Sequence, residues 1–207
     1  MIVIIDYGLG NLGSLANMFK KFGAKTVVTS DPGEIARADK LVLPGVGSFD
    51  AGMRNLVERG LIEPLNERVL SAKVPILGIC LGMQLLGRKS EEGTLGGLGW
   101  LEAEAVRFRF EGEQRGLKIP HMGWNRLRIT GKSPLFEGLE QESRFYFVHS
   151  YHMVADREDV VMAETTYGFP FNSVIGKGNI IGVQFHPEKS HKYGMQMLKN
   201  FAEVGPG

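Results

Sequence analysis

The sequence has few of the features that mark secreted, membrane or nucleic-acid-binding proteins. One cysteine among 207 residues excludes an internal disulfide and favours a reducing compartment. No apolar run approaches the roughly 20 residues that span a bilayer, and the first residues carry no basic leader. Lys and Arg number 24 against 23 Asp and Glu, so no overall field exists to hold nucleic acid or an anionic membrane. We therefore expect a cytoplasmic protein that binds neither nucleic acid nor membrane.

What the sequence contains is typical of a globular protein with one core. The apolar share is 43% and the charged share is 23%, both ordinary values for such a chain. A length of 207 residues fits a single domain. Internal repeats, low-complexity tracts and interdomain linkers are not seen. We predict one domain over residues 1–207.

Short β-branched runs alternate with helical patterns in the first half of the chain. The runs are residues 2–5, 26–28, 41–43 and 76–79. Between the first two, apolar residues at spacings of three and four predict a helix, with Leu12, Leu15, Ala16, Phe19 and Phe22 on its buried stripe. This alternation predicts a parallel sheet covered by helices.

The second half of the chain has a different pattern. Runs at residues 100–110, 144–148 and 174–185 are joined by glycine and charged turns, without long helices between them. Such connections favour antiparallel additions to the sheet. A last apolar stripe predicts a closing helix that carries Met197, Leu198, Phe201 and Val204.

A glycine motif follows the first predicted strand. Gly8, Gly10 and Gly13 form the pattern G-x-G-x-x-G before a helix, and Asp31 lies where a ribose-binding acid would be expected. One hypothesis is therefore a non-catalytic protein that binds a dinucleotide at the helix N-terminus. The alternative, which we favour, is a tight turn in which the glycines only relieve steric conflict.

The strongest chemical signal is the segment Gly78-Ile79-Cys80-Leu81-Gly82, between a buried strand and a helical pattern. It has the form of a nucleophile elbow with cysteine in place of serine. The flanking glycines permit a sharp turn, and the helix N-terminus favours the thiolate form of Cys80. A packed core cysteine in a glycine-rich turn explains the pentapeptide equally well when it is taken alone.

The segment His186-Pro187-Glu188 favours the catalytic interpretation. Side chains alternate in an extended chain, so His186 and Glu188 should project to the same side, and the proline keeps His186 out of the helical region. A carboxylate beside an imidazole stabilises its charged form, so His186 can activate Cys80. A zinc site at His149 and His152 is a poor alternative, because it needs further ligands from afar. We expect neither a metal nor a cofactor.

Acyl transfer also needs donors aimed at the developing oxyanion. The backbone N–H of Leu81, directly after the candidate nucleophile, is one donor that the elbow predicts. The loop Gly45-Val46-Gly47 is a second source, because its glycines permit the backbone to aim an N–H into the site. Alone, this loop is equally well explained as an ordinary turn at the end of a strand.

Taken together, these motifs resemble the class I glutamine amidotransferases, most closely the glutaminase subunits of imidazole glycerol phosphate synthases. The resemblance spans nearly the whole chain. It is carried by residues 6–11, the loop at Gly45, the elbow at Cys80, the segment Pro120-His121-Met122-Gly123-Trp124-Asn125, residues 145–151 and residues 185–190.

The resemblance implies an α/β fold with a doubly wound, mostly parallel sheet, helices on both faces and antiparallel additions. It further implies hydrolysis of glutamine to glutamate and ammonia. The ammonia would pass to a partner, a cyclase subunit with a (β/α)₈ barrel, within a heterodimer. That subunit makes imidazole glycerol phosphate and an aminoimidazole carboxamide ribotide. The same glutaminase chemistry in the service of another synthase remains open at this point.

The resemblance also implies a glutamine pocket. Gln84 and Glu92 correspond to pocket residues, with Glu92 suited to the substrate ammonium, whereas taken alone it would be interpreted as a solvated loop charge. His149, Ser150 and Tyr151 correspond to the strand that holds the carboxylate end of the substrate. His152 departs from the family pattern, because relatives often carry tyrosine at this position. The shape of the pocket rim is therefore not determined by the resemblance.

Overall fold

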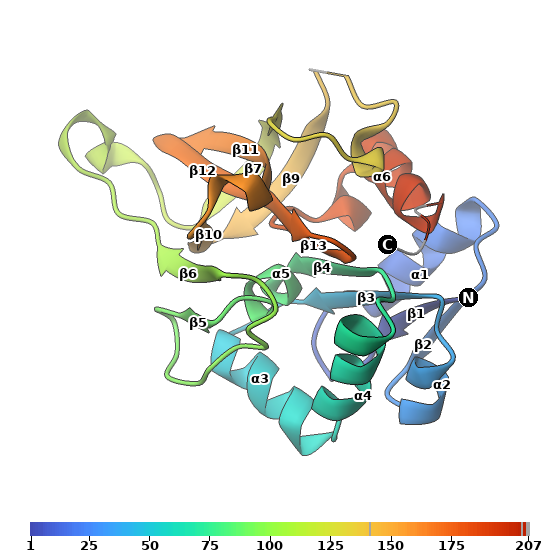
Figure 1. Cartoon of the computed structure of the whole chain (residues 1–207). Coiled ribbons are helices and arrows are strands. Elements are labelled where there is room, and N and C mark those ends of the chain that lie inside the picture. Colours follow the sequence, from blue (N-terminus) through green and yellow to red (C-terminus); the bar gives the residue numbers. More distant parts are fainter. Residues whose placement is uncertain (141, 204, 206–207) are drawn as a thin grey trace.

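A computed structural model describes residues 1–140, 142–203 and 205 (Figure 1). Five parallel strands form one side of its main sheet, with β2 at the edge, in the order β2-β1-β3-β4-β13. They comprise Thr26–Thr29, Ile2–Ile5, Lys40–Gly45, Ile76–Cys80 and Ile180–Val183. Strands β1, β4 and β13 are buried at every residue, as expected of parallel strands covered on both faces. The four strands predicted in the first half of the chain are confirmed.

Helices cover both faces of this sheet, as the fold class requires. On one face lie α1 (Leu12–Lys21) and α6 (His191–Glu203). The other face is covered by α2 (Pro32–Ala36), α3 (Phe49–Glu58), α4 (Ile62–Asn66) and α5 (Leu81–Leu85). Figure 1 shows α3 and α4 on the side of the sheet opposite α6. Within the described ranges, no helix is both long enough and apolar enough to cross a membrane.

The two helices of the first face use the apolar stripes that the sequence predicts. Leu15 and Phe19 of α1 share a core cluster with Met197, Leu198 and Phe201 of α6. This cluster also includes Ile2 and Ile4, whereas Val3 and Ile5 belong to the cluster on the opposite face, in agreement with the alternation of side chains along a strand. Val204, which the predicted stripe included, lies outside the described residues.

The second half of the chain adds antiparallel strands to the sheet. Next to β13 follow β12 (Phe169–Lys177), β10 (Tyr151–Ala155), β6 (Ala103–Arg107) and β5 (Lys89–Ser90), of which only the β5–β6 pair is parallel. A side branch contains β11 (Val161–Tyr167) and β8 (Arg128–Ile129). A separate antiparallel pair consists of β7 (His121–Arg126) and β9 (Arg144–His149). Antiparallel additions were predicted correctly, but the run 100–110 forms a strand only over Ala103–Arg107. The run 174–185 contains the end of β12 and all of β13, and β13 is parallel to β4.

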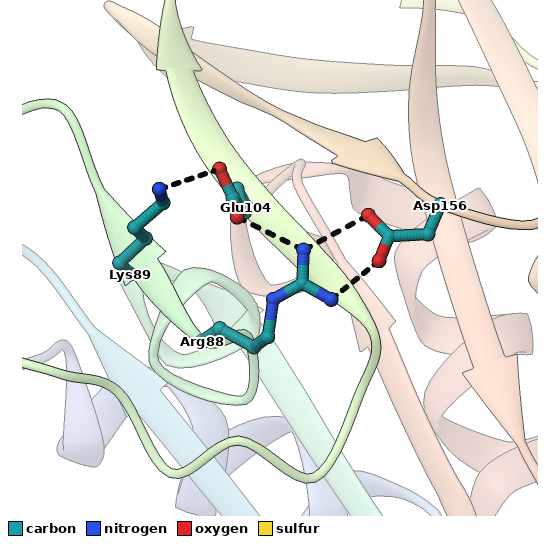
Figure 2. Close-up of polar contacts among 4 residues, drawn as sticks. All are labelled: Arg88, Lys89, Glu104 and Asp156. Atoms are coloured by element: carbon teal, nitrogen blue, oxygen red, sulfur yellow. Dashed lines mark hydrogen bonds and ion pairs between the residues drawn. The ribbon is translucent and has the colours of Figure 1, made fainter.

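An ion-pair network ties the outer strands of the sheet together. Figure 2 shows Arg88, just before β5, between Glu104 of β6 and Asp156, which directly follows β10. Arg88 Nη2 lies 2.9 Å from Glu104 Oε1 and 3.0 Å from Asp156 Oδ1, and Lys89 Nζ lies 3.3 Å from Glu104 Oε2. The hydrogen bonds to Arg88 hold the pKa of both carboxyl groups below the ordinary range. Because these ion pairs are largely exposed, they contribute little to stability.

Candidate active site

Cys80 ends strand β4 in a strained backbone conformation. Its φ is +55° and its ψ is −110°, and α5 begins at the next residue. A side chain at Gly82 is excluded, because a Cβ there would lie 1.8 Å from the Leu43 carbonyl oxygen. This is the sharp strand-to-helix turn that the sequence predicts. However, α5 has only five residues, so its dipole contributes less to the thiolate than a full helix would.

His186 lies beside Cys80 because strands β13 and β4 are neighbours. Val183 pairs with Ile79 in their parallel register, and His186 follows β13 at the same edge of the sheet. His186 Nδ1 is 2.9 Å from Glu188 Oε1, and both side chains are almost fully buried, at 2% and 3% exposure. The two side chains meet as predicted, but Pro187–Lys189 is one turn of 3₁₀ helix and not the extended chain assumed from alternation.

The environment of His186 favours its charged form. Burial lowers its pKa, but the adjacent Cys80 sulfur and Glu188 carboxylate outweigh burial and raise the pKa from 6.5 to about 10. Of the side-chain atoms in the described residues, His186 Nε2 is one of the few buried ones that lack a hydrogen-bond partner. The ring therefore has one nitrogen anchored by Glu188 and one left for the sulfur and a reacting group.

Neighbouring residues hold the His186 backbone in place. His186 N donates to the Tyr146 carbonyl at 2.9 Å, and Ser190 Oγ donates to the His186 carbonyl at 2.6 Å. Tyr146 N in turn donates to Ser190 Oγ at 3.0 Å. We did not predict these roles from the sequence, although both residues lie in segments that carry the family resemblance.

One cavity of about 320 Å³ gathers most of the predicted site residues, a volume that suits a small ligand. Ten of its lining residues were named from the sequence, namely Val46, Gly47, Cys80, Leu81, Gln84, Glu92, His149, Ser150, Tyr151 and His186. Pro120 and Val148 complete the lining. Two predicted residues lie outside the lining, because Glu188 sits behind His186 and Gly45 is buried under the loop.

Gly45 is packed too tightly to carry a side chain. A Cβ on Gly45 would lie 2.3 Å from Tyr7 Oη and 2.8 Å from Leu81 Cβ. Tyr7 is wholly buried, and its hydroxyl finds no hydrogen-bond partner among the described residues. Burial, and secondly the negative charge of Cys80, raise the pKa of Tyr7. Tyr7 is a further residue at the site whose place was not predicted.

Glu92 belongs to the cavity and is held at the end of a helix. Phe49 N, the first N–H of α3, donates to Glu92 Oε2 at 2.8 Å. The loop that carries Glu92 is fixed by Asp50, which accepts from Thr94 N at 3.0 Å and from Leu95 N at 3.1 Å. The Thr94 and Leu95 N–H groups hold the pKa of Asp50 below its ordinary value. Glu92 is exposed, as a solvated loop charge would be, but its carboxylate is held in place at the cavity by the Phe49 N–H.

The segment 149–151 also lines the cavity. The Ser150 carbonyl accepts from Phe108 N at 3.0 Å, and the Tyr151 carbonyl accepts from Gln84 Nε2 at 3.3 Å. Gln84 Nε2 also donates to Gln184 Oε1 at 3.2 Å, and Gln184 Nε2 lies 3.8 Å from the Cys80 sulfur. Gln184 was not assigned a role from the sequence, although it directly precedes the motif at His186.

The glycine motif at the first turn is used for the turn itself. Gly8 and Gly10 have φ values of +87° and +112°, in the left-handed region that favours glycine. The Asp31 carboxylate accepts from Glu34 N at 2.9 Å and so caps α2. Gly8, Gly10 and Asp31 therefore have structural roles, whereas Gly13 lies in α1 with open space where a Cβ would be.

His121, His149 and His152 are buried with aromatic rings. Phe108 contacts all three, and its ring centre lies 4.7 Å from that of His152. In the parts of the chain that the structure describes, no group of three or more His, Cys, Asp or Glu side chains could hold a metal ion. Burial lowers the pKa of His121 from 6.5 to about 4 and that of His149 to about 3, and it also lowers the pKa of His152.

These buried histidines predict a loss of stability in mild acid. Between pH 6.5 and 5 the unfolded chain binds protons at positions where the folded chain remains neutral, so the free energy of unfolding falls as the pH falls. Each such histidine contributes a slope that rises from about 0.7 kcal/mol per pH unit at pH 6.5, where the unfolded imidazole is half protonated, to about 1.3 kcal/mol per pH unit near pH 5. His186 acts in the opposite direction, because its raised pKa keeps it protonated in the folded chain while the unfolded imidazole is only half protonated at pH 6.5, and this contribution fades by pH 5.

Urea unfolding at several pH values measures this slope. His121→Phe should reduce the mean slope between pH 6.5 and 5 by about 1 kcal/mol per pH unit, since one proton-binding site disappears from the unfolded chain. The window lies above the range in which carboxyl groups titrate. An unchanged slope in the variant would show that His121 is protonated in the folded chain.

Comparison with known proteins agrees with this geometry. The family described as "Glutamine amidotransferase class-I" matches residues 3–204. The chain therefore belongs to the class I glutamine amidotransferase family. It is 52% identical to "Imidazole glycerol phosphate synthase subunit HisH 2" of Methanococcus maripaludis, over 97% of this chain and 98% of the relative. It is 50% identical to "Imidazole glycerol phosphate synthase subunit HisH" of Sulfurimonas denitrificans, over 98% of each chain.

Solved structures confirm the predicted fold class. A crystal structure described as a glutamine amidotransferase from Thermotoga maritima covers 98% of this chain and 83% of its own, with a TM-score of 0.64 and 19% identity. Another, described as a glutamine amidotransferase, covers 99% of this chain and 100% of its own, with a TM-score of 0.71 and 19% identity. At these identities the likeness concerns the fold alone.

Proposed function

We propose that this chain is the glutaminase subunit of an imidazole glycerol phosphate synthase and works as a single domain in the cytoplasm. The observation that carries the proposal is the cavity in which Cys80 and His186 lie together, with Glu188 bonded behind the imidazole. Family membership supports the glutaminase chemistry, and the subunits named above support the synthase.

The proposed reaction uses Cys80 as nucleophile. Its thiolate attacks the side-chain amide carbon of glutamine, and the oxygen takes up negative charge. N–H groups of Leu81 and Val46 stabilise this oxygen. The protonated His186, oriented by Glu188, gives its proton to the departing ammonia and leaves a thioester between Cys80 and glutamate. Water then attacks the thioester with His186 as base, which releases glutamate and restores the thiolate.

The cavity offers complementary groups for both charged ends of glutamine. We assign the Glu92 carboxylate to the substrate ammonium, because its loop is fixed by Asp50 and by the N-terminus of α3. We assign the wall of His149, Ser150 and Tyr151 to the substrate carboxylate. The carbonyl oxygens of Ser150 and Tyr151 already accept hydrogen bonds from protein groups. They therefore repel a substrate carboxylate less than free carbonyl oxygens would.

The partner in this proposal is a (β/α)₈ cyclase subunit that consumes the ammonia. We define the partner face as Met122, Trp124, Lys189 and His191. Met122 and Trp124 are apolar side chains exposed at 62% and 45% on one side of β7, and the Trp124 ring stacks on His191 at 5.3 Å. Exposed large apolar side chains beside charged ones are typical of protein interfaces. Lys189 directly follows Glu188, so this face adjoins the proposed catalytic residues.

Lys189→Ala tests whether this face transmits stimulation by the partner. The Lys189 ammonium lies over the Tyr146 ring at 5.7 Å, and the Tyr146 carbonyl holds His186. We expect a roughly tenfold weaker stimulation of glutaminase activity by the cyclase, within the usual range of allosteric coupling. Lys192→Ala, one turn away and also exposed, is the matched control. Unchanged stimulation together with unchanged complex affinity in Lys189→Ala would reject the interface role.

The function itself is tested by reconstitution. The chain is mixed with the barrel cyclase subunit of the same organism, and glutamate release is measured with and without the cyclase substrate. Production of imidazole glycerol phosphate from glutamine is expected only when both subunits are present. If glutamate forms but the product does not, the glutaminase serves another synthase. If neither forms, the proposed function is wrong.

A further inference from the structure

Two buried histidines connect the cavity wall to strand β7. His121 and His149 are opposite each other in the antiparallel register of β7 and β9, and His121 Nδ1 lies 3.1 Å from His149 Nε2. At one end of this pair, His149 Nδ1 is 2.7 Å from the Tyr151 carbonyl oxygen. At the other end, Asn125 Nδ2 is 3.4 Å from His121 Nε2. The contacts form a continuous chain from β7 to the wall of the cavity.

The direction of the hydrogen bonds in this chain can be assigned. Both imidazoles are neutral near pH 7, because burial lowers the pKa of His121 to about 4 and that of His149 to about 3. A neutral imidazole has one N–H donor and one acceptor nitrogen. The Tyr151 carbonyl only accepts, so His149 Nδ1 carries the proton and His149 Nε2 accepts from His121 Nδ1–H. His121 Nε2 then accepts from the Asn125 amide, and every group in the chain is satisfied.

The chain ends on a carbonyl that borders the substrate wall. The Tyr151 carbonyl oxygen receives His149 Nδ1–H at 2.7 Å and Gln84 Nε2 at 3.3 Å. Without the proton on His149 Nδ1, this oxygen would lose its shorter hydrogen bond. A less engaged carbonyl oxygen beside the wall would repel a substrate carboxylate and would also be free to change orientation.

We propose that His121 is a positioning residue for glutamine, which through His149 keeps the Tyr151 carbonyl turned into the protein. The inference rests on the proposed function, since it takes the substrate to be glutamine. His121 is absent from the lining of the cavity and so acts through another residue. Its essential group is the Nδ1–H, which satisfies His149 Nε2 and thereby holds the imidazole with its Nδ1–H on the Tyr151 carbonyl.

A purely structural role for His121 has to be separated from this one. The imidazole stacks on Tyr167 at 4.1 Å and on Phe147 at 4.9 Å, so its ring contributes to packing. His121→Phe keeps a flat ring and removes both nitrogens. His121→Asn removes the ring and keeps an amide N–H near the position of Nδ1. His121→Phe therefore keeps the ring stacking and loses the hydrogen-bond donor, whereas His121→Asn keeps a donor and loses the ring stacking.

The experiment uses the complex of this chain with its cyclase subunit. KM and kcat for glutamine hydrolysis are measured for both variants, and glutamine binding is measured by calorimetry in the Cys80→Ala background. His121→Phe should raise KM and Kd about tenfold with kcat within about twofold, whereas His121→Asn should raise them less than about threefold.

Three results would overturn the proposal. They are wild-type KM and Kd in His121→Phe, a larger rise in His121→Asn than in His121→Phe, or a loss confined to kcat. If His121→Phe does not fold, His121→Asn alone decides, and a tenfold rise of its KM would contradict the inference. A wild-type complex that neither binds nor hydrolyses glutamine would instead refute the proposed function.

Discussion

Cys80→Ala is expected to abolish glutamine-dependent synthesis by the complex and to leave synthesis from added ammonium salt intact. The nucleophile serves only the release of ammonia, whereas the cyclase uses ammonia from any source. Loss of an essential nucleophile lowers kcat by about 10⁴-fold or more, which leaves no measurable glutamate release. Glutamate and imidazole glycerol phosphate are measured separately, with glutamine or with ammonium chloride as the nitrogen donor.

Glutamine binding and the fold serve as controls for this variant. Cys80 is almost fully buried, and alanine removes only its sulfur, so the urea midpoint should change little. Calorimetry should still detect bound glutamine, because Glu92 and the wall at 149–151 are untouched. If Cys80→Ala lost both the glutamine-dependent and the ammonia-dependent reaction, the proposed division of labour would be contradicted. If it still released glutamate, the assignment of Cys80 as nucleophile would be contradicted.

Local sequence patterns were sufficient to predict the parallel half of the fold. Strands β1 and β4 are short runs buried on both faces, and α1 has a clear apolar stripe, so each could be recognised without knowledge of its partners. Strand β7 could not be recognised from a local pattern, because His121–Arg126 mixes polar, aromatic and glycine residues. Its partner β9 also lies about twenty residues further along the chain. Its existence depends on tertiary pairing more than on local preference.

The candidate site likewise has one part that local motifs predict and another part that depends on how distant strands pair. The elbow at Cys80 and the histidine–carboxylate pair at His186 are local motifs, and the resemblance supplied the rest of the lining. The contact of His121 with His149 was not predicted, because it depends on the register of two strands. Tyr7 was missed for a related reason, since its position under Gly45 follows only from the order of β1 and β3 in the sheet.

The loop Gly45-Val46-Gly47 is the second place where a large effect is expected. We propose that it supplies one oxyanion donor and that an idle subunit keeps this donor turned away. Gly45 pairs with Cys80 in the register of β3 and β4, so the peptide that carries the Val46 N–H directly follows the position opposite the nucleophile. Gly47 has a φ of +118°, which allows the chain to turn directly after Val46.

A substitution at Gly45 would not test this idea cleanly. Any Cβ at that position meets Tyr7 Oη and Leu81 Cβ, so loss of activity could follow from disturbed packing. Val46 is a better position, because its side chain is 43% exposed and lines the cavity. Val46→Pro removes the N–H, and the restriction that proline places on the preceding residue agrees with the extended conformation of Gly45 in β3. Val46→Ala keeps the N–H and is the matched control.

Val46→Pro should lower the stimulated kcat for glutamine hydrolysis by roughly 100- to 1,000-fold, the usual effect of losing one oxyanion donor. KM for glutamine should change little, because the ground-state amide does not carry the charge that the donor stabilises. Val46→Ala should keep kcat within about threefold, and synthesis from ammonium chloride should persist in both variants, since neither touches the cyclase. All rates are measured on the assembled complex with the cyclase substrate present. A stimulated kcat in Val46→Pro equal to that of Val46→Ala would show that the second donor is not the Val46 N–H.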